Sequence, residues 1–408
     1  MDRGRRGVGA RRCPVGGPSI RASAGYLSRV SETRAISPGV GMSHGDPRGA
    51  SAPGPSVSLA PVAFRPPLRE RTLDVVVTRG GTVESRHRVH AAVVDAAGTL
   101  LEGARDPLTT TWWRSCAKPF QVMPLVRAGG FEQVGWGVTE LALACASHGG
   151  EPEHVALAGS MLASIGLAAG DLACGPHEPL AARGARILRE SGDRPTRLHN
   201  NCSGKHAAML AHALFRGDPT AGYEQEGHAV QQVARETVAT WAGIAPDGLG
   251  LGVDGCGVTV FSLPLAHMAL AYARLAHAST HGDEPARRIV QAMTSHPFLV
   301  GGSERFDTQL MEATGGNVVC KIGAEGVHTF AIVDRGIGFA LKVEDGSARA
   351  QFVAVLALLA AYDALPSPLP DALREAAVRA VRNTRGEQVG DVFISAEPLG
   401  AYGRASGR

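Results

Sequence analysis

The order of strand and helix patterns along this chain restricts its fold more than any other feature. Strand patterns flank a helical region, at Leu73–Thr78, Val83–Val94, Thr99–Glu102, Asn317–Ile322, Val327–Val333, Gly338–Val343 and Asp391–Ser395. Helical spacing of apolar residues occurs near 119–128, 138–146, 153–166, 203–215, 224–243, 264–277, 283–295, 304–313 and 348–362. We therefore predict an α+β fold, in which both chain ends build one antiparallel sheet and a helical lobe is inserted beside it.

Residues 1–71 differ in composition from the rest of the chain. They carry 12 arginines against four acidic residues and are rich in Gly, Pro and Ser. Such a segment has too little apolar material to form a core, so we predict a disordered tail and a folded domain over residues 72–400. The basic excess of the chain lies in the tail, and the remaining residues carry a net negative charge. This distribution argues against nucleic acid as a partner.

Neither a membrane segment nor an export signal is indicated by the sequence. No stretch reaches the roughly 18 apolar residues of a membrane span, and the first residues lack the apolar run of a signal peptide. Seven cysteines in such a chain are typical of reduced thiols. We therefore expect a cytoplasmic location and no membrane partner.

Lysine is unusually rare in this sequence. The 41 basic residues include only four lysines, namely Lys118, Lys205, Lys321 and Lys342. Arginine stays charged at any working pH, whereas a desolvated lysine can lose its proton and act as a base. Three of the four lysines occur in motifs that suggest chemistry, and Lys342 is most simply a surface residue of a hairpin.

Two lysine motifs indicate serine chemistry. Ser115 and Lys118 share one face of a predicted helix start, where Pro119 is tolerated and where backbone N–H groups can stabilise an oxyanion. Lys321 ends a predicted strand and is followed by Gly323, which permits close approach of a substrate. This order of motifs is that of penicillin-recognising serine enzymes. The alternatives are an ordinary helix cap and a charge at a strand end.

A third motif ends a predicted helix at Ser147. The glycines after His148 form the end of the helix, which places Ser147 at an exposed corner. Its hydroxyl would serve as a second proton relay. The alternative, favoured by the sequence alone, is a polar residue that merely ends the helix.

A fourth constellation offers metal ligands. Cys202 and Lys205 share one face of a helical turn, and Cys256 follows some fifty residues later. Two sulfurs, a deprotonated amine and a water would satisfy four-coordinate zinc, although His206 would be the more ordinary ligand. From spacing alone, two buried thiols without a metal are the better interpretation.

Taken together and in this order, the motifs resemble those of the asparaginase II family, the rhizobial-type L-asparaginases. The matching stretches are Arg114–Gln121, Ala146–His148, Asn201–His206, Asp254–Gly257 and Lys321–Gly326. The resemblance covers about residues 72–400, and it implies a serine β-lactamase-like fold and hydrolysis of L-asparagine to L-aspartate and ammonia.

The resemblance also implies roles for particular residues. It makes Ser115 and Lys118 one Ser–Lys pair and Ser147 and Lys321 a second. The pattern leaves open which serine attacks first, and we expect Ser115 to be the attacking serine. It implies zinc held by Cys202, Lys205 and Cys256, which would modulate substrate binding rather than generate the nucleophile. A homodimer is the family expectation.

The substrate implied by the resemblance is a zwitterion and needs groups of both charges. Arg114 is the candidate for its α-carboxylate, because a guanidinium fork suits a carboxylate. Asp254 is the candidate for its ammonium group, and His148 and Glu325 are weaker candidates that would line the site. Arg114 and Asp254 could equally be structural ion-pair partners.

Other functions remain open at this stage. One alternative is a glutaminase or a penicillin-recognising serine hydrolase, which would use the same serine and lysine motifs. A second alternative is a non-enzymatic binding protein that zinc stabilises through Cys202, Lys205 and Cys256.

Overall fold

The computed structural model describes residues 61–377 and 379–399. Contacts divide the chain into residues 1–50 and 51–408, and all described residues belong to the second unit. Most of the predicted tail, residues 1–60, lies outside the described residues. Residues 61–71 lie against the folded body, where Val62 N–H donates to Gly243 O and Arg71 N–H donates to Gly103 O, each at 2.9 Å. Residues 61–71 therefore pack against the domain that was predicted to begin at residue 72.

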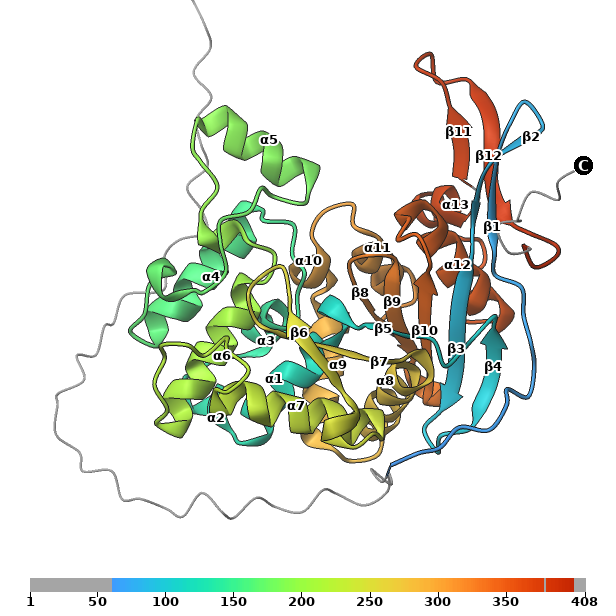
Figure 1. Ribbon diagram of the computed structural model, residues 1–408. Helices are drawn as coiled ribbons and strands as arrows, with labels where there is room; N and C mark the ends of the chain where they lie inside the picture. Colours follow the sequence, from blue (N-terminus) through green and yellow to red (C-terminus); the bar gives the residue numbers. More distant parts are fainter. Residues whose placement is uncertain (1–60, 378, 400–408) are drawn as a thin grey trace, which may run out of the picture. The chain divides into compact units, whose positions relative to one another are not determined.

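Two antiparallel sheets join the two ends of the described chain (Figure 1). The five-stranded sheet has the order β4-β3-β10-β9-β8, with bounds Leu100–Ala104, Val89–Asp95, Ile337–Val343, Val327–Ile332 and Val318–Ile322. The four-stranded sheet has the order β11-β12-β1-β2, with bounds Arg379–Arg382, Gln388–Ile394, Val75–Arg79 and Thr82–His87. The predicted α+β class, with strands from both chain ends and an inserted helical region, is confirmed.

The prediction of one sheet from the two ends was too simple. The stretch Val83–Val94, predicted as one strand, divides at Arg88 into β2 and β3, which belong to different sheets. The physical reason lies in burial, because β2 is largely exposed whereas β3 is almost wholly buried. A third sheet, of order β5-β7-β6, joins Thr110–Trp112, Thr259–Pro264 and Gly250–Val253 and was not predicted as a sheet.

Helices form the region between the strands and cover the five-stranded sheet (Figure 1). Their bounds are α1 Lys118–Arg127, α2 Gly130–Gln133, α3 Val138–Ala144, α4 Pro152–Ser164, α5 Ala182–Ser191, α6 Ser203–Arg216, α7 Ala229–Ala242, α8 Leu265–Thr280, α9 Glu284–Ser295, α10 Pro297–Gly301, α11 Phe306–Ala313, α12 Ala348–Ala361 and α13 Asp371–Ala377. Short 3-10 turns are Arg114–Ala117 (η1), Ala169–Asp171, Arg197–His199, Pro246–Gly248 and Val333–Arg335. The long predicted helices are confirmed, whereas α2, α5, α10 and α13 were missed.

The central helix α8 packs on β3, β9 and β10. It approaches β10 so closely that a Cβ on Gly338 would lie 2.0 Å from the carbonyl oxygen of Ala269. Only glycine fits at this contact. Helix α12 contacts β9 and β10 as well, so the sheet is a buried layer. Side chains near the ends of its strands are therefore buried too. Among the described residues, we find no helix with the length and apolar content that a membrane span requires.

Candidate active site

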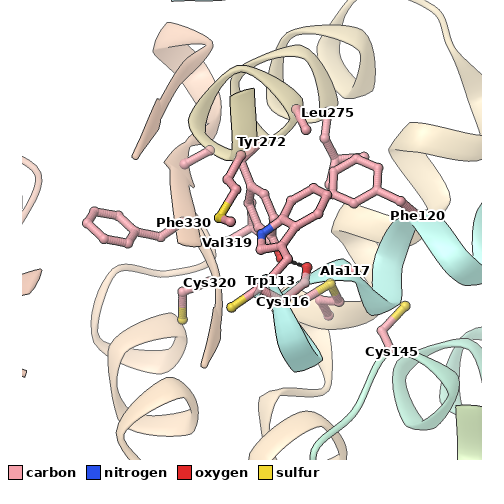
Figure 2. Packing of buried hydrophobic residues seen from close by; sticks show 14 of the residues in the cluster. Trp113, Cys116, Ala117, Phe120, Cys145, Tyr272, Leu275, Val319, Cys320 and Phe330 are labelled. Carbon is pink, nitrogen blue, oxygen red and sulfur yellow. Dashed lines mark hydrogen bonds between the residues drawn. The ribbon is translucent and has the colours of Figure 1, made fainter. Parts of the chain in front are cut away.

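The turn that carries Ser115 is fixed by aromatic packing (Figure 2). Trp113 is fully buried and stacks on Phe120, with ring centroids 5.1 Å apart. Tyr272 of α8 donates its hydroxyl hydrogen to Cys116 O at 2.9 Å. Residues Arg114–Ala117 form η1, and α1 begins at Lys118, so the predicted helix start at this motif is confirmed. Ser115 therefore lies on a short turn that is anchored on both sides.

Arg114 begins this turn with a left-handed backbone, at a φ of 54°. Such a conformation costs a non-glycine residue free energy, which the surroundings must offset. Its Nε donates to Asp254 Oδ1 at 2.7 Å, and the Gly255 N–H donates to the same oxygen at 2.8 Å. The ion pair that the sequence left as an alternative is thus present. Within the described residues, the Nη groups of Arg114 make no hydrogen bond, so they remain able to bind an anion.

Lys118 points into the interior, with 1% of its surface exposed. Its Nζ donates to Ser147 Oγ at 3.0 Å and to Asn201 O at 3.4 Å, and it also contacts Ala146 O. Buried amines require such partners, because desolvation of an unpaired cation is very costly. The helical pairing that the sequence suggested, Lys118 with Ser115, is replaced by a contact with the loop after α3.

Lys321 reaches the same serine from the sheet. It lies on β8 with no exposed surface, and its Nζ donates to Ser147 Oγ at 2.8 Å and to Ile322 O at 2.9 Å. The predicted pair of Ser147 and Lys321 is therefore hydrogen bonded in the structure. Two amines from distant parts of the chain thus converge on one hydroxyl oxygen.

Ser147 is buried, with 4% of its surface exposed, rather than at the exposed corner that the sequence suggested. Helix α3 ends at Ala144, and the chain then turns inward because the Ser147 N–H donates to Val300 O at 3.0 Å. A serine hydroxyl has two acceptor positions and one donor hydrogen. When both amines donate, its own hydrogen lacks an acceptor among them, whereas a neutral amine can take that hydrogen. The arrangement is therefore suited to proton relay.

The electrostatic setting of Lys321 favours loss of its proton. Burial and the nearby Lys118 lower the pKa of Lys321 to about 8, while the buried carboxylate of Asp307 acts in the opposite direction. A neutral amine is thus available near neutral pH, as general-base chemistry needs. Sequence reasoning gave no role to Asp307 or Asn201, although Asn201 begins one of the stretches that carry the family resemblance.

Ser115 is only partly buried, and its hydroxyl makes no hydrogen bond within the described part of the chain. It lies three residues before Lys118 at the start of the same helical segment. The hydroxyl is thus more accessible than that of Ser147. Long or absent contacts are common for catalytic groups without substrate.

The three predicted metal ligands lie together and are buried. Lys205 Nζ donates to Cys256 Sγ at 3.2 Å, and a hydrogen bond links the thiols of Cys202 and Cys256. This bond and the nearby Lys205 lower the pKa of Cys256 to about 4, although burial acts in the opposite direction. For Cys202 the same bond and burial act together and raise the pKa to about 12. Although burial acts against it, Cys256 and Cys202 keep the pKa of Lys205 above its usual value, so its ammonium group must lose a proton before it can bind a metal. Two sulfurs and a deprotonated amine would then be available as zinc donors.

The remaining predicted site residues lie at the edges of this region. His148 is fully buried, and its ring accepts from Gly150 N–H at 3.1 Å and bonds Ser203 Oγ at 2.9 Å. These bonds hold the loop after Ser147 in place. Glu325 is exposed in the turn between β8 and β9, where its backbone is left-handed at a φ of 61°. His148 therefore lies in the buried loop next to Ser147, whereas Glu325 lies at the surface.

Comparison with known proteins gives one family match. A family model described as L-asparaginase II matches residues 75–394. No curated protein sequence matches the chain significantly.

Solved structures show weak similarity. A structure described as Mglu has a TM-score of 0.39 at 17% identity, over 73% of this chain and 72% of that one. A β-lactamase from Mycobacterium bovis has a TM-score of 0.34 at 12% identity, over 67% and 94% of the two chains. A Bacillus glutaminase has a TM-score of 0.32 at 14% identity, over 68% and 91%. At these scores the likeness carries no argument.

Proposed function

Because this chain belongs to the L-asparaginase II family, we propose that it is an amidohydrolase that converts L-asparagine to L-aspartate and ammonia. The observation that supports this most is the buried chain of hydrogen bonds from Lys118 through Ser147 to Lys321. Two amines around one hydroxyl provide the groups that amide hydrolysis by a serine enzyme needs, namely a base and a route for protons.

Ser115 is the attacking residue in this proposal, and Ser147 relays protons. An attacking oxygen must contact the substrate, which the partly exposed Ser115 can do more readily than the almost fully buried Ser147. Ser115 also neighbours Arg114, whose Nη groups make no hydrogen bond to any described residue. Its position at the start of a helical segment places backbone N–H groups near the developing oxyanion.

The reaction would proceed through an ester of Ser115. Its oxygen attacks the carbonyl carbon of the side-chain amide, and its proton passes through Lys118 and Ser147 to the neutral amine of Lys321. The C–N bond then breaks, and the amide nitrogen leaves as ammonia after it receives that proton back from Lys321 by the same route. Water attacks the ester carbon, its proton passes to Lys321 in the same way and then returns to the oxygen of Ser115, and aspartate is released.

Substrate binding in this proposal depends on the ion pair beside the nucleophile. Asp254 holds the Nε of Arg114, so the Nη groups are oriented for a carboxylate. Burial acts against the charge of Asp254, but Lys205 and then Arg114 keep its pKa below the usual value. The second oxygen of Asp254 would accept from the substrate ammonium group, with His148 and Glu325 as weaker contributors.

Zinc is part of the proposal, held by Cys202, Lys205 and Cys256. These donors fit the ion, because two sulfurs and an amine lie together in a buried cluster whose Cys256 thiol readily ionises. A bound zinc ion would supply positive charge next to the Asp254 segment and so modulate substrate affinity. A homodimer and a cytoplasmic location remain predictions of the sequence.

The experiment that tests the proposal measures ammonia release by the full chain from L-asparagine and from L-glutamine. Lys118→Ala and Lys321→Ala should each abolish release while the fold, followed by circular dichroism, survives. Lys342→Ala is the matched control, because this lysine bonds the Glu344 carbonyl at 3.2 Å rather than a serine. Near-full turnover in both active-site variants would refute the dual-lysine mechanism.

The alternatives predict other outcomes. Preferential release from L-glutamine would make the protein a glutaminase. Covalent labelling of Ser115 by a labelled penicillin would favour a penicillin-recognising enzyme. If neither amide is hydrolysed and Lys118→Ala leaves ligand binding intact, the zinc-stabilised binding protein is the better interpretation.

A further inference from the structure

A buried carboxylate lies behind the strand that carries Lys321. Asp307, near the start of α11, has 3% of its surface exposed. Its Oδ2 accepts from the Ile322 N–H at 2.7 Å, and its Oδ1 lies 3.0 Å from Nε2 of His328 on β9. Burial of a carboxylate with so few partners costs free energy of folding, so we expect its charge to have a role.

The position of Asp307 links it to the amine of Lys321. Successive residues of β8 alternate between the two faces of the sheet, so Lys321 points toward Ser147 while Ile322 pairs with His328 on the other face. Asp307 holds the N–H of Ile322, and the carbonyl of Ile322 accepts from Lys321 Nζ at 2.9 Å. The carboxylate thus fixes the residue that holds the amine.

The negative charge of Asp307 also opposes the main influences on Lys321 that disfavour its protonated form. The titratable or charged groups that act on Lys321, or on which its charge acts, are Lys118 of α1, Cys116 of η1, Cys145 after α3, Arg305 before α11, Cys320 of β8 and Asp307 itself. The cations Lys118 and Arg305 and the effect of burial disfavour a protonated Lys321, whereas the carboxylate favours it. Burial raises the pKa of Cys116 and Cys145 to about 12, so these thiols stay neutral.

A metal site is the rival interpretation of the same residues. Ligand atoms of Asp307, Cys320 and His328 lie within 4.8 Å of one another, and all three residues are buried. No fourth His, Cys, Asp or Glu ligand joins them among the described residues, and one carboxylate oxygen already binds the backbone. A structural zinc site has four ligands. The observations therefore favour a role of Asp307 toward Lys321.

We propose that Asp307 is a positioning residue, which holds the Lys321 amine against Ser147 and supplies the buried negative charge that keeps this amine basic enough to return a proton. The inference rests on the proposed function, because it assigns a partner to one of the lysines of that mechanism. It predicts that a neutral residue at position 307 changes the protonation of Lys321 and not merely the stability of the fold.

The scarcity of lysine makes a direct test possible. In the full chain with lysine labelled with ¹³C at Cε, nuclear magnetic resonance should show at most four lysine signals, and Lys342→Arg and Lys321→Ala assign two of them. Asp307→Asn should lower the pKa of Lys321 by at least about one pH unit, as expected when a nearby opposite charge is removed. Asp307→Ser, which is smaller and can still accept the Ile322 N–H, repeats the test if the Asn variant does not fold.

Matched variants separate position from charge. Cys320→Ser alters a buried neighbour without removing a charge and should leave the Lys321 titration unchanged. Asp307→Glu keeps the negative charge, so the pKa of Lys321 should stay close to its value in the wild type. His328→Gln should not lower the pKa of Lys321, because His328 competes for the same carboxylate. An unchanged Lys321 titration in a folded neutral variant would overturn the proposal.

Activity and metal content complete the test. The acidic limb of the pH profile of kcat/KM for ammonia release should move in the same direction as the Lys321 titration. If the titration shifts but the wild type hydrolyses no amide, the proposed function fails while the coupling of Asp307 and Lys321 stands. Loss of one bound metal ion in Asp307→Asn, with the ion at Cys202 and Cys256 retained, would instead establish the rival site and overturn ours.

Discussion

Replacement of Ser147 by alanine tests the relay most directly. The substitution removes the oxygen that accepts from Lys118 at 3.0 Å and from Lys321 at 2.8 Å. It leaves Asn201 O for Lys118 and Ile322 O for Lys321, so each amine keeps a partner. The backbone of the loop is unaffected, because the Ser147 N–H to Val300 O bond does not involve the side chain.

The size of both effects follows from these contacts. Loss of a buried hydrogen-bond partner costs about 1–3 kcal/mol, and because both amines retain other acceptors we expect about 2 kcal/mol in the free energy of unfolding. Loss of a proton relay lowers kcat by roughly 10²–10⁴-fold, which corresponds to about 3–5 kcal/mol in the activation barrier. KM should change little, because Ser147 is not among the groups proposed to bind the substrate.

The assay is steady-state ammonia release from L-asparagine, with stability followed by urea unfolding. Ser279→Ala is the matched control, since Ser279 is a buried serine of α8 whose hydroxyl donates to Ala276 O at 2.7 Å. It should lose stability without loss of kcat. If Ser147→Ala keeps kcat within about threefold of the wild type, the hydrogen bonds around Ser147 are structural and the relay is refuted; that bound lies well below the smallest expected loss.

Three further predictions follow from the site. The free base of Lys321 is required, and its pKa is lowered to about 8, so kcat/KM should fall as pH drops below about 8 and level off above it; a profile flat from pH 6 to 9 would contradict this. Arg114→Met should raise KM for L-asparagine by about 10–100-fold, the loss of one charged hydrogen-bonding group, with a smaller effect on kcat, and an unchanged KM would assign Arg114 a purely structural role. Cys256→Ser or a chelator should remove zinc, measured by elemental analysis, and raise KM without abolishing turnover; a zinc-free wild type would exclude the metal.

The sequence predicted the chemical groups of the site but not all of their contacts. Lys118 and Ser115 are close in sequence, and the local pattern suggested that they pair. In the structure Lys118 instead meets Ser147, because the chain after α3 turns inward and is held by Val300 of α10, which is distant in sequence. The periodicity of apolar residues predicts one helix at a time and carries no information about a contact between distant segments.

The same limit explains the errors in the fold. The stretch Val83–Val94 has the composition of one strand, and its division between two sheets depends on partners from β1 and β10 that are far apart in sequence. Helix α5 has few apolar residues and α10 is short, so neither shows a clear apolar pattern and both were missed. By contrast, the long helices and the three late strands were predicted because their local patterns agree with their burial.

The sequence by itself singled out the side chains that are proposed to do chemistry, since only four of the 41 basic residues are lysines, whose proton can be removed. It also determined the α+β class, because apolar spacing fixes the type of each long element. Only the tertiary structure decided which hydroxyl the amines of Lys118 and Lys321 share and which carboxylate stands behind Lys321. Proton affinity depends on burial and on charges a few ångströms away, and the fold brings these together from residues that lie far apart along the chain.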